Sequence, residues 1–133
     1  MALSADDRFA ITDLINRHGH LMDRGDFEGA EALFTADVVY DVSAFGAGVQ
    51  VGLAGAREAA YARIDSQPVA HHVTNIVLEE TGDGVVHALS KGIGILADGS
   101  AGSVTYDDTV NRTPVGWRIT HRIVRPRRTP LRD

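Results

Sequence analysis

The hydrophobic pattern of the chain changes its period about halfway along, and this change constrains the fold more than any other feature of the sequence. Up to residue 65, apolar residues recur mainly at helical spacing, whereas from residue 71 they follow strand-like runs. Turns with the sequences TGDG, ADGSAG and TPVG separate these runs. The runs are HHVTNIVLEE, VVHALSKGIGIL, SVTYDDTVNR and WRITHRIV. Helices followed by consecutive strands predict an α+β fold, with the helices across one face of a curved, mainly antiparallel sheet.

A capping box marks the start of the first helix. Ser4 is followed three residues later by Asp7, which takes the place of the usual glutamate or glutamine. The helix is expected to run to about Met22, because Gly25 ends the pattern. Its buried stripe is predicted to contain Ile11, Leu14, Ile15, His18 and Met22.

Three further elements are expected before the run of strands. Asp26 can cap a second helix, which would carry Phe27, Ala30, Leu33 and Phe34. A strand over 38–43 would place Val38, Tyr40 and Val42 on one face. After the glycine-rich loop FGAGVQVGLAG, a third helix is expected over 56–65. Three helices are therefore available to cover the sheet.

Length and composition restrict the class of protein. The 133 residues suit one domain, over residues 1–133, with a single hydrophobic core. No apolar run approaches the roughly 20 residues that span a bilayer, and the N-terminus lacks the pattern of a secretion signal. Cysteine is absent, which excludes a disulfide framework and a thiolate metal site. A cytoplasmic protein without a membrane partner is therefore expected.

Positive charge is concentrated near the C-terminus, although the formal net charge is −5. The segment RIVRPRRTPLRD contains five arginines, Arg122, Arg125, Arg127, Arg128 and Arg132. A nucleic-acid-binding surface would combine such residues with stacking aromatic side chains, and this segment has none. We therefore expect no nucleic-acid partner, and interpret the segment as a solvated tail or a subunit contact.

Asp23 is unusual because it places a carboxylate in the last turn of the first helix. The negative end of the helix dipole disfavours an anion there by roughly 0.3–1 kcal/mol. If the site is also desolvated, both effects raise the pKa of the carboxyl group and make it a better proton acceptor, as a general base requires. An exposed aspartate in the turn sequence DRGD explains the pattern equally well.

Two adjacent histidines begin the first of the later strands. Neighbouring side chains in a strand point to opposite faces, so one of His71 and His72 is expected to face inward. Either face could be the buried one. An inward imidazole next to a carboxylate would form a proton-transfer dyad, whereas a purely structural role is the alternative.

No motif for a metal or cofactor is present. HExxH and cysteine are both absent, and the six histidines are scattered along the chain. The sequence also lacks a GxSxG elbow, a dinucleotide fingerprint and a glycine-rich phosphate loop that opens a helix. Neither a metal nor a cofactor is therefore expected. His18 alone would be interpreted as a satisfied core histidine, and Tyr40 as a core tyrosine.

Four segments together resemble a known family. MDRGDF, LFTADVVYD, HHVTN and GWRITHR follow the order and spacing of the SnoaL-like branch of the nuclear-transport-factor-two-like superfamily. The resemblance spans nearly the whole chain and implies a cone-shaped α+β barrel. Its pattern is closest to scytalone dehydratase, hexachlorocyclohexane dehydrochlorinase and bile-acid dehydratase. Fold alone does not imply activity, because the superfamily contains lyases, isomerases, hydrolases, cyclases and non-catalytic binders.

The resemblance assigns roles to particular residues. The family's catalytic Asp and His fall on Asp23 and His71, and the polar residue that precedes the Asp falls on His18. The family aromatic on the first strand falls on Tyr40. The pocket arginine after the last tryptophan falls on Arg122. Asn75 and His72 are further candidates for substrate binding. The second catalytic histidine of scytalone dehydratase and the additional aspartate of the bile-acid enzyme have no match.

These assignments lead to a hypothesis about function. We expect a cofactor-free lyase or isomerase, with dehydration as the leading reaction, that acts on a small, apolar, cyclic substrate. Polyketide cyclisation and ketosteroid-type isomerisation are alternatives, as is a non-catalytic ligand-binding or assembly module. Epoxide hydrolysis would need an Asp-Arg-Asp arrangement, for which Asp107 and Asp108 are available. Because the convex face of such a sheet tends to be apolar, a homo-oligomer, dimer or trimer, is also expected.

Overall fold

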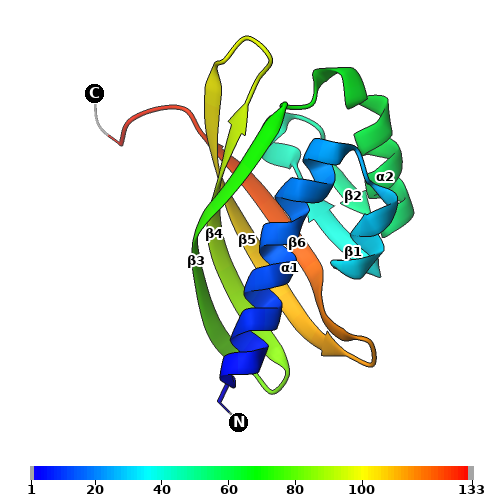
Figure 1. Ribbon diagram of the computed structural model, residues 1–133, viewed down its shortest axis with the longest axis vertical. Helices are drawn as coiled ribbons and strands as arrows, with labels where there is room; N and C mark the ends of the chain where they lie inside the picture. Colours follow the sequence, from blue (N-terminus) through cyan, green and yellow to red (C-terminus); the bar gives the residue numbers. More distant parts are fainter. Residues whose placement is uncertain (1, 132–133) are drawn as a thin grey trace.

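The computed structural model describes residues 2–131 and consists of two α-helices packed on a six-stranded mixed sheet (Figure 1). The strand order is β2-β1-β6-β5-β4-β3, and the sheet does not close. Strands β1 and β6 are parallel, and the other neighbours are antiparallel. The elements are α1 (Ala5–Arg24), β1 (Phe34–Asp41), β2 (Val49–Val51), α2 (Leu53–Ala62), β3 (Ala70–Gly82), β4 (Val85–Ile95), β5 (Ala101–Thr113) and β6 (Gly116–Arg127). The predicted α+β class is confirmed.

The first helix begins where the capping box predicts. The Ser4 hydroxyl accepts the amide N–H of Asp7 (3.0 Å), and the Asp7 carboxylate accepts the amide of Ser4 (3.3 Å). The same carboxylate accepts the indole N–H of Trp117 (3.1 Å), so it also ties α1 to β6. Gly25 ends the helix in the left-handed conformation (φ 67°), which favours glycine.

The predicted second helix is wrong. The segment forms only a 3-10 helix, Glu28–Ala32, and Phe34 already belongs to β1. The reason is tertiary, because the Leu33 carbonyl accepts the amide of Ile119 (2.8 Å) where β1 joins β6. The third helix is observed as α2 and begins earlier than predicted, at Leu53; a short 3-10 helix, Ile64–Ser66, follows it.

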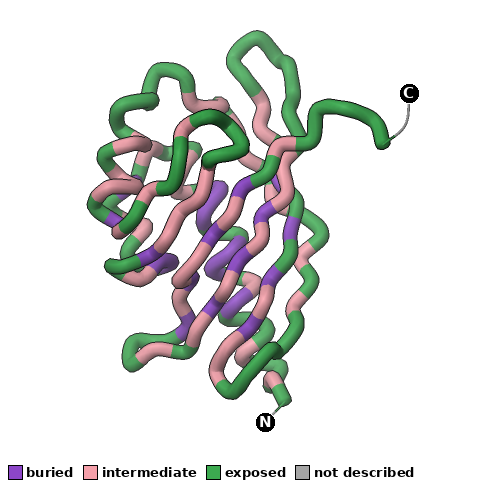
Figure 2. Tube along the Cα trace, turned by 180° about the vertical axis from the view of Figure 1, so that it is seen from behind, coloured by how far each residue is buried: buried purple, intermediate pink, exposed green. Residues whose placement is uncertain are grey.

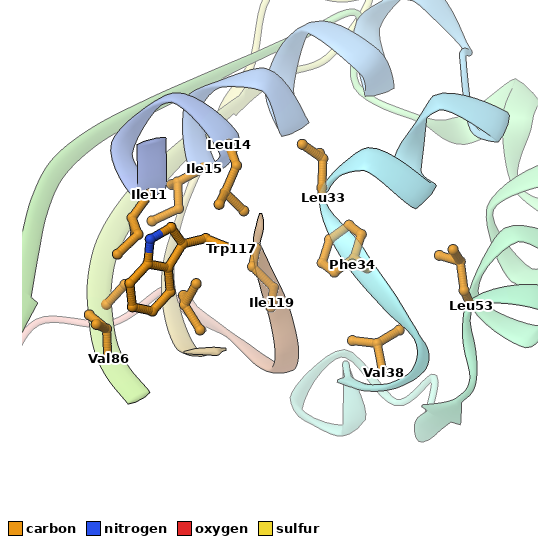
Figure 3. Close-up of a cluster of buried hydrophobic side chains, with 12 residues drawn as sticks. Ile11, Leu14, Ile15, Leu33, Phe34, Val38, Leu53, Val86, Trp117 and Ile119 are labelled. Carbon is orange, nitrogen blue, oxygen red and sulfur yellow. The ribbon is translucent and has the colours of Figure 1, made fainter. Parts of the chain in front are cut away.

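The core lies between α1 and the concave face of the sheet. Figure 3 shows side chains of α1, among them Ile11 and Ile15, against Trp117, Ile119 and Val86 from the strands. All five are at most 6% exposed. Burial of an aliphatic side chain of this size contributes roughly 1.5–3 kcal/mol. In Figure 2, buried and less buried positions alternate along the central strands, as expected for a sheet with one covered face.

A bulge in β3 interrupts the alternation that the sequence predicts. Asn75 has a positive φ of 55°, and the pairing register with β4 shifts between Thr74 and Val77. Val73 packs against the core before the bulge, and Ile76 does so after it. A regular strand would place His71, Asn75 and Val77 on one face, but the β-bulge re-aims the side chains that follow it, so they do not share a face.

The sheet face opposite α1 carries several exposed apolar side chains. Val77, Leu89 and Ile93 are 63%, 42% and 40% exposed in the single chain. This pattern is compatible with the expected homo-oligomer, which stays a prediction. Neither helix in the described part of the chain is long and apolar enough to cross a membrane.

Candidate active site

Asp23 and His71 meet where the end of α1 contacts the start of β3. Asp23 Oδ1 lies 2.7 Å from His71 Nδ1, and Asp23 Oδ2 accepts the backbone N–H of His71 (3.1 Å). The two side chains are 29% and 13% exposed. A carboxylate in this position favours a proton on Nδ1, which leaves Nε2 of the neutral ring as an acceptor. The geometry suits a base that is held in one orientation.

A glycine makes this close approach possible. Gly19 lies one turn before Asp23 in α1, and a Cβ atom at this position would lie 2.9 Å from the carbonyl oxygen of His71. The absence of a side chain therefore allows β3 to pack directly on the helix backbone. Gly19 is not among the site residues predicted from the sequence, although an isolated glycine inside a helical pattern is a signal of close packing.

His18 and Tyr40 form a second polar pair. The His18 Nε2 and Tyr40 hydroxyl atoms are 3.4 Å apart, and the histidine ring packs edge-on against Phe34 and Tyr106. Burial holds the pKa of His18 well below its usual value, and the positive charge of Arg122 lowers it further. Burial also raises the pKa of Tyr40. Both groups are therefore neutral near pH 7, and Tyr40 can donate a hydrogen bond.

Arg122 is fully buried and is paired with Asp108. Its Nε and one Nη each donate to a carboxylate oxygen at 2.7 Å, and the exposed fractions of the two side chains are 1% and 0%. Burial alone would lower the pKa of Arg122, but the charge and hydrogen bonds of Asp108 outweigh this effect and raise it. The guanidinium lies 4.4 Å from the centroid of the Tyr106 ring.

This arrangement corrects two expectations. Arg122 does not line the cavity. It lies behind the cavity wall, where its guanidinium packs on the ring of Tyr106, so it is not placed to contact a substrate directly. Asp107 lies on the opposite face of β5 and binds His87 (2.6 Å) and Arg125 (3.1 Å). Because only one aspartate faces Arg122, the Asp-Arg-Asp arrangement of the epoxide-hydrolysis hypothesis is not formed by these residues.

The two remaining candidates lie away from the site. His72 is exposed on the outer face of β3, because it neighbours the inward-facing His71 in an extended strand. Asn75 is exposed at the bulge. Neither residue lines the cavity, so their location does not support the predicted role in substrate binding. Residues 2–131 contain no cluster of three or more histidine or acidic side chains suited to a metal ion.

His18, Tyr40 and His71 line one cavity of about 810 Å³. Most of the remaining wall is apolar and comes from α1, α2, β1 and the ends of β5 and β6; it includes Leu21, Met22, Phe27, Leu53 and Val124. Cavities of this size accept molecules as large as typical drugs, and a few polar groups in an apolar wall orient the ligand. The site can therefore hold a ring compound against an imidazole base.

The comparisons with known proteins agree with this fold. The family model of the SnoaL-like domain matches residues 4–123. A Novosphingobium aromaticivorans protein, provisionally described as an aromatic ring hydroxylase, is 29% identical; the match covers 96% of this chain and 94% of that chain, with a TM-score of 0.78. No curated protein matches the chain.

Two further solved structures share the fold. LinA is 21% identical, with 96% of this chain and 90% of that chain covered and a TM-score of 0.80. A protein from Novosphingobium aromaticivorans, provisionally described as a scytalone dehydratase, is 18% identical, with 96% and 91% covered and a TM-score of 0.75. At these identities the likeness establishes the fold and leaves the activity open.

Proposed function

This chain belongs to the SnoaL-like domain family, and we propose that it is a cofactor-free lyase or isomerase, with dehydration of a small, apolar, cyclic substrate as the leading reaction. The observation that carries the proposal is the contact between Asp23 and His71 at the wall of an apolar cavity. The contact supplies a base of defined orientation, and the cavity supplies space for a ring.

The first step is removal of a proton from carbon. Nε2 of His71 takes a proton from a carbon next to an electron-withdrawing group of the substrate. Asp23 keeps the ring in position through Nδ1 and stabilises the imidazolium that forms. The electron pair of the broken C–H bond becomes the new double bond.

The second step uses the neutral Tyr40, whose hydroxyl lies beside the neutral ring of His18. The Tyr40 hydroxyl donates a hydrogen bond to the substrate oxygen. In a dehydration it also gives its proton to the departing hydroxide, so that water leaves, and it recovers a proton from solvent while His71 releases one. In an isomerisation the same hydroxyl would stabilise an enolate oxygen. A preorganised donor of this kind contributes about 3–4 kcal/mol to catalysis.

A screen of hydroxylated and keto ring compounds tests the reaction. Products are identified by mass spectrometry, because dehydration removes one water whereas isomerisation and cyclisation by aldol addition leave the mass unchanged. Loss of one water from a ring alcohol is the expected result. A rearranged product of equal mass would replace dehydration with isomerisation or cyclisation, and binding without turnover of any compound would favour the non-catalytic alternative.

Substitutions at the dyad test the assigned residues. Asp23→Asn and His71→Ala should each reduce kcat by about 10²–10⁴-fold, the range for a positioned acid or base. His72→Ala is the matched control, because this neighbouring histidine lies outside the cavity. The thermal unfolding midpoints of all three variants should stay close to that of the parent. Full activity of either dyad variant would refute the assignment, and global unfolding of both would mark the pair as structural.

A further inference from the structure

Three arginines lie at the solvent end of the cavity. Arg63 follows α2, Arg127 ends β6 and Arg128 comes directly after it. All three are exposed and also line the cavity. In Figure 1 the C-terminal ends of α1, α2 and β6 gather at the same end of the molecule, which explains how residues far apart in the sequence share one rim.

The arginines of the rim have no carboxylate partner among the described residues. Within residues 2–131, no acidic side chain lies within salt-bridge distance of any of the three arginines. Arg57, which lines the cavity from the middle of α2, is different because two glutamates lie 3.6 Å and 3.7 Å from its guanidinium. Asp26, an acidic residue of the cavity wall, already accepts the amide N–H of Gly29 (3.0 Å).

Two of the arginines are held at the rim by local contacts. Arg127 Nε donates to the backbone carbonyl of Thr129 (3.1 Å), which leaves the two Nη groups available to a ligand. The Arg128 guanidinium lies 5.6 Å from the centroid of the Phe45 ring, and Phe45 also lines the cavity. A guanidinium is suited to bidentate binding of a carboxylate or phosphate.

The deep part of the cavity differs from the rim. Its apolar wall favours an uncharged ring or chain, and the buried charge of Arg122 behind it is neutralised by Asp108. A ligand that matches both regions must be amphipathic. The contrast between the two ends therefore indicates how the substrate enters, with its apolar part first.

We propose that the substrate carries an anionic group at the end remote from the reacting carbon, and that Arg127 and Arg128, assisted by Arg63, bind this group. The proposal rests on the proposed function above and adds an anionic group to the apolar ring of its substrate, which makes the substrate an amphipathic anion. A free carboxylic acid and a coenzyme A thioester both have this chemistry, since the anion is a carboxylate in one and a phosphate in the other.

Two fluorescent probes with the same ring system test the anion site without turnover. 8-Anilinonaphthalene-1-sulfonate carries a sulfonate, whereas N-phenyl-1-naphthylamine has no charge. In the variant Arg127→Gln/Arg128→Gln, the Kd of the sulfonate should rise by about tenfold or more, because hydrogen bonds to a charged group are lost. The Kd of the neutral probe should change less than about twofold, because the apolar wall is intact.

Arg125→Gln provides a matched control from the same strand. Arg125 is paired with Asp107 on the opposite face of the sheet, so its loss should leave the Kd of both probes unchanged. Equal weakening of the two probes in the double variant, or no weakening of the sulfonate, would overturn the proposal. A changed molecular mass in light scattering with unchanged sulfonate binding would also overturn it, and would identify the arginines as a subunit contact.

Competition against the neutral probe distinguishes the two sources of the anion. Three competitors are tested on the parent protein and on the double variant: decanoate, decanoyl-coenzyme A and the uncharged 1-decanol. If one of the two anions competes more strongly than 1-decanol, and this advantage is lost in the double variant, the result supports the proposal and identifies the anion as a carboxylate or a phosphate. Equal competition by all three refutes it. Asp23→Asn should bind both probes normally, so failure of the dyad assignment and failure of the anion site are separate results.

Discussion

Gly19→Ala tests how the candidate site is held together. The added methyl group would lie 2.9 Å from the carbonyl oxygen of His71, and real Cβ contacts are seldom shorter than 3.4 Å. Because both sides of the contact are packed, β3 must move away from α1 by about 0.5 Å at this point. This displacement separates His71 from Asp23, which lies one turn after Gly19 on the same side of the helix.

The expected magnitude follows from the hydrogen bond between the His71 amide and Asp23 Oδ2. Its length of 3.1 Å would become about 3.6 Å if the strand moved directly away, which is outside hydrogen-bond range. A bond to a charged acceptor contributes about 1.5 kcal/mol at the lower end of its range. Its loss corresponds to roughly tenfold faster exchange of the His71 amide with solvent.

Amide exchange measured by NMR is the assay, and Gly55→Ala is its control. Gly55 lies in α2, and a Cβ there would meet nothing within 4 Å. In the control, the free energy of unfolding should therefore rise by roughly 0.5–1 kcal/mol, the usual effect of replacing glycine by alanine in a helix. The exchange rate of the His71 amide should not change. Gly19→Ala should show less than this gain in thermal unfolding, because the contact with β3 offsets it.

One combination of results would contradict the role of Gly19 in the contact between α1 and β3. If Gly19→Ala is stabilised as much as Gly55→Ala and its His71 amide exchanges at the parental rate, the strand accommodates the methyl group without moving. The close approach would then be unnecessary for the geometry of the site. Reduced turnover in Gly19→Ala, with the fold intact, would instead agree with a positioning role, since misplacement by about 1 Å costs as much as 10²-fold in rate.

Two further predictions concern buried polar groups. Asp108→Asn should lower the free energy of unfolding by about 3–5 kcal/mol in urea titrations, because it leaves the Arg122 charge buried without its partner; a loss below about 1 kcal/mol would show that the charge finds another partner. His18 should make the parent less stable in acid, because the unfolded imidazole binds a proton below pH 6.5 whereas the folded one, with its lowered pKa, does not. Relative to His18→Leu, the free energy of unfolding of the parent should therefore fall by up to about 1.4 kcal/mol per pH unit below 6.5. The same dependence of the free energy of unfolding on pH in both proteins would contradict this.

Local patterns in the sequence were sufficient for much of the fold. The capping box at Ser4 and the glycine at position 25 identify both ends of α1, because capping involves residues within one turn of the helix end. The alternation of the later runs identifies the strands. The inward position of His18 follows from helical spacing alone. The meeting of Asp23 and His71 was expected from the family resemblance, not from the spacing of either residue.

The C-terminal arginines show what local patterns leave open. The sequence pattern suggested that they form one basic tail, but most of them belong to β6 or directly follow it. Arg122 is buried against Asp108, Arg125 faces outward to Asp107, and Arg127 and Arg128 border the cavity. Their different environments follow from the pairing of β6 with β5, which puts Arg122 opposite Asp108, and from the position of the end of β6 at the cavity.

Sequence patterns alone are enough to predict the fold class and the limits of the first helix, and to name candidate residues for chemistry. Three features depend on tertiary contacts: residues 28–32 form a short 3-10 helix, β3 bulges at Asn75, and His71 rather than His72 faces the cavity. The two groups of features differ in the range of the interactions that set them. Helix caps and side-chain periodicity depend on near neighbours, whereas strand partners, bulges and cavity walls depend on residues far away in the chain, as where Phe34 pairs with Ile119, 85 positions later.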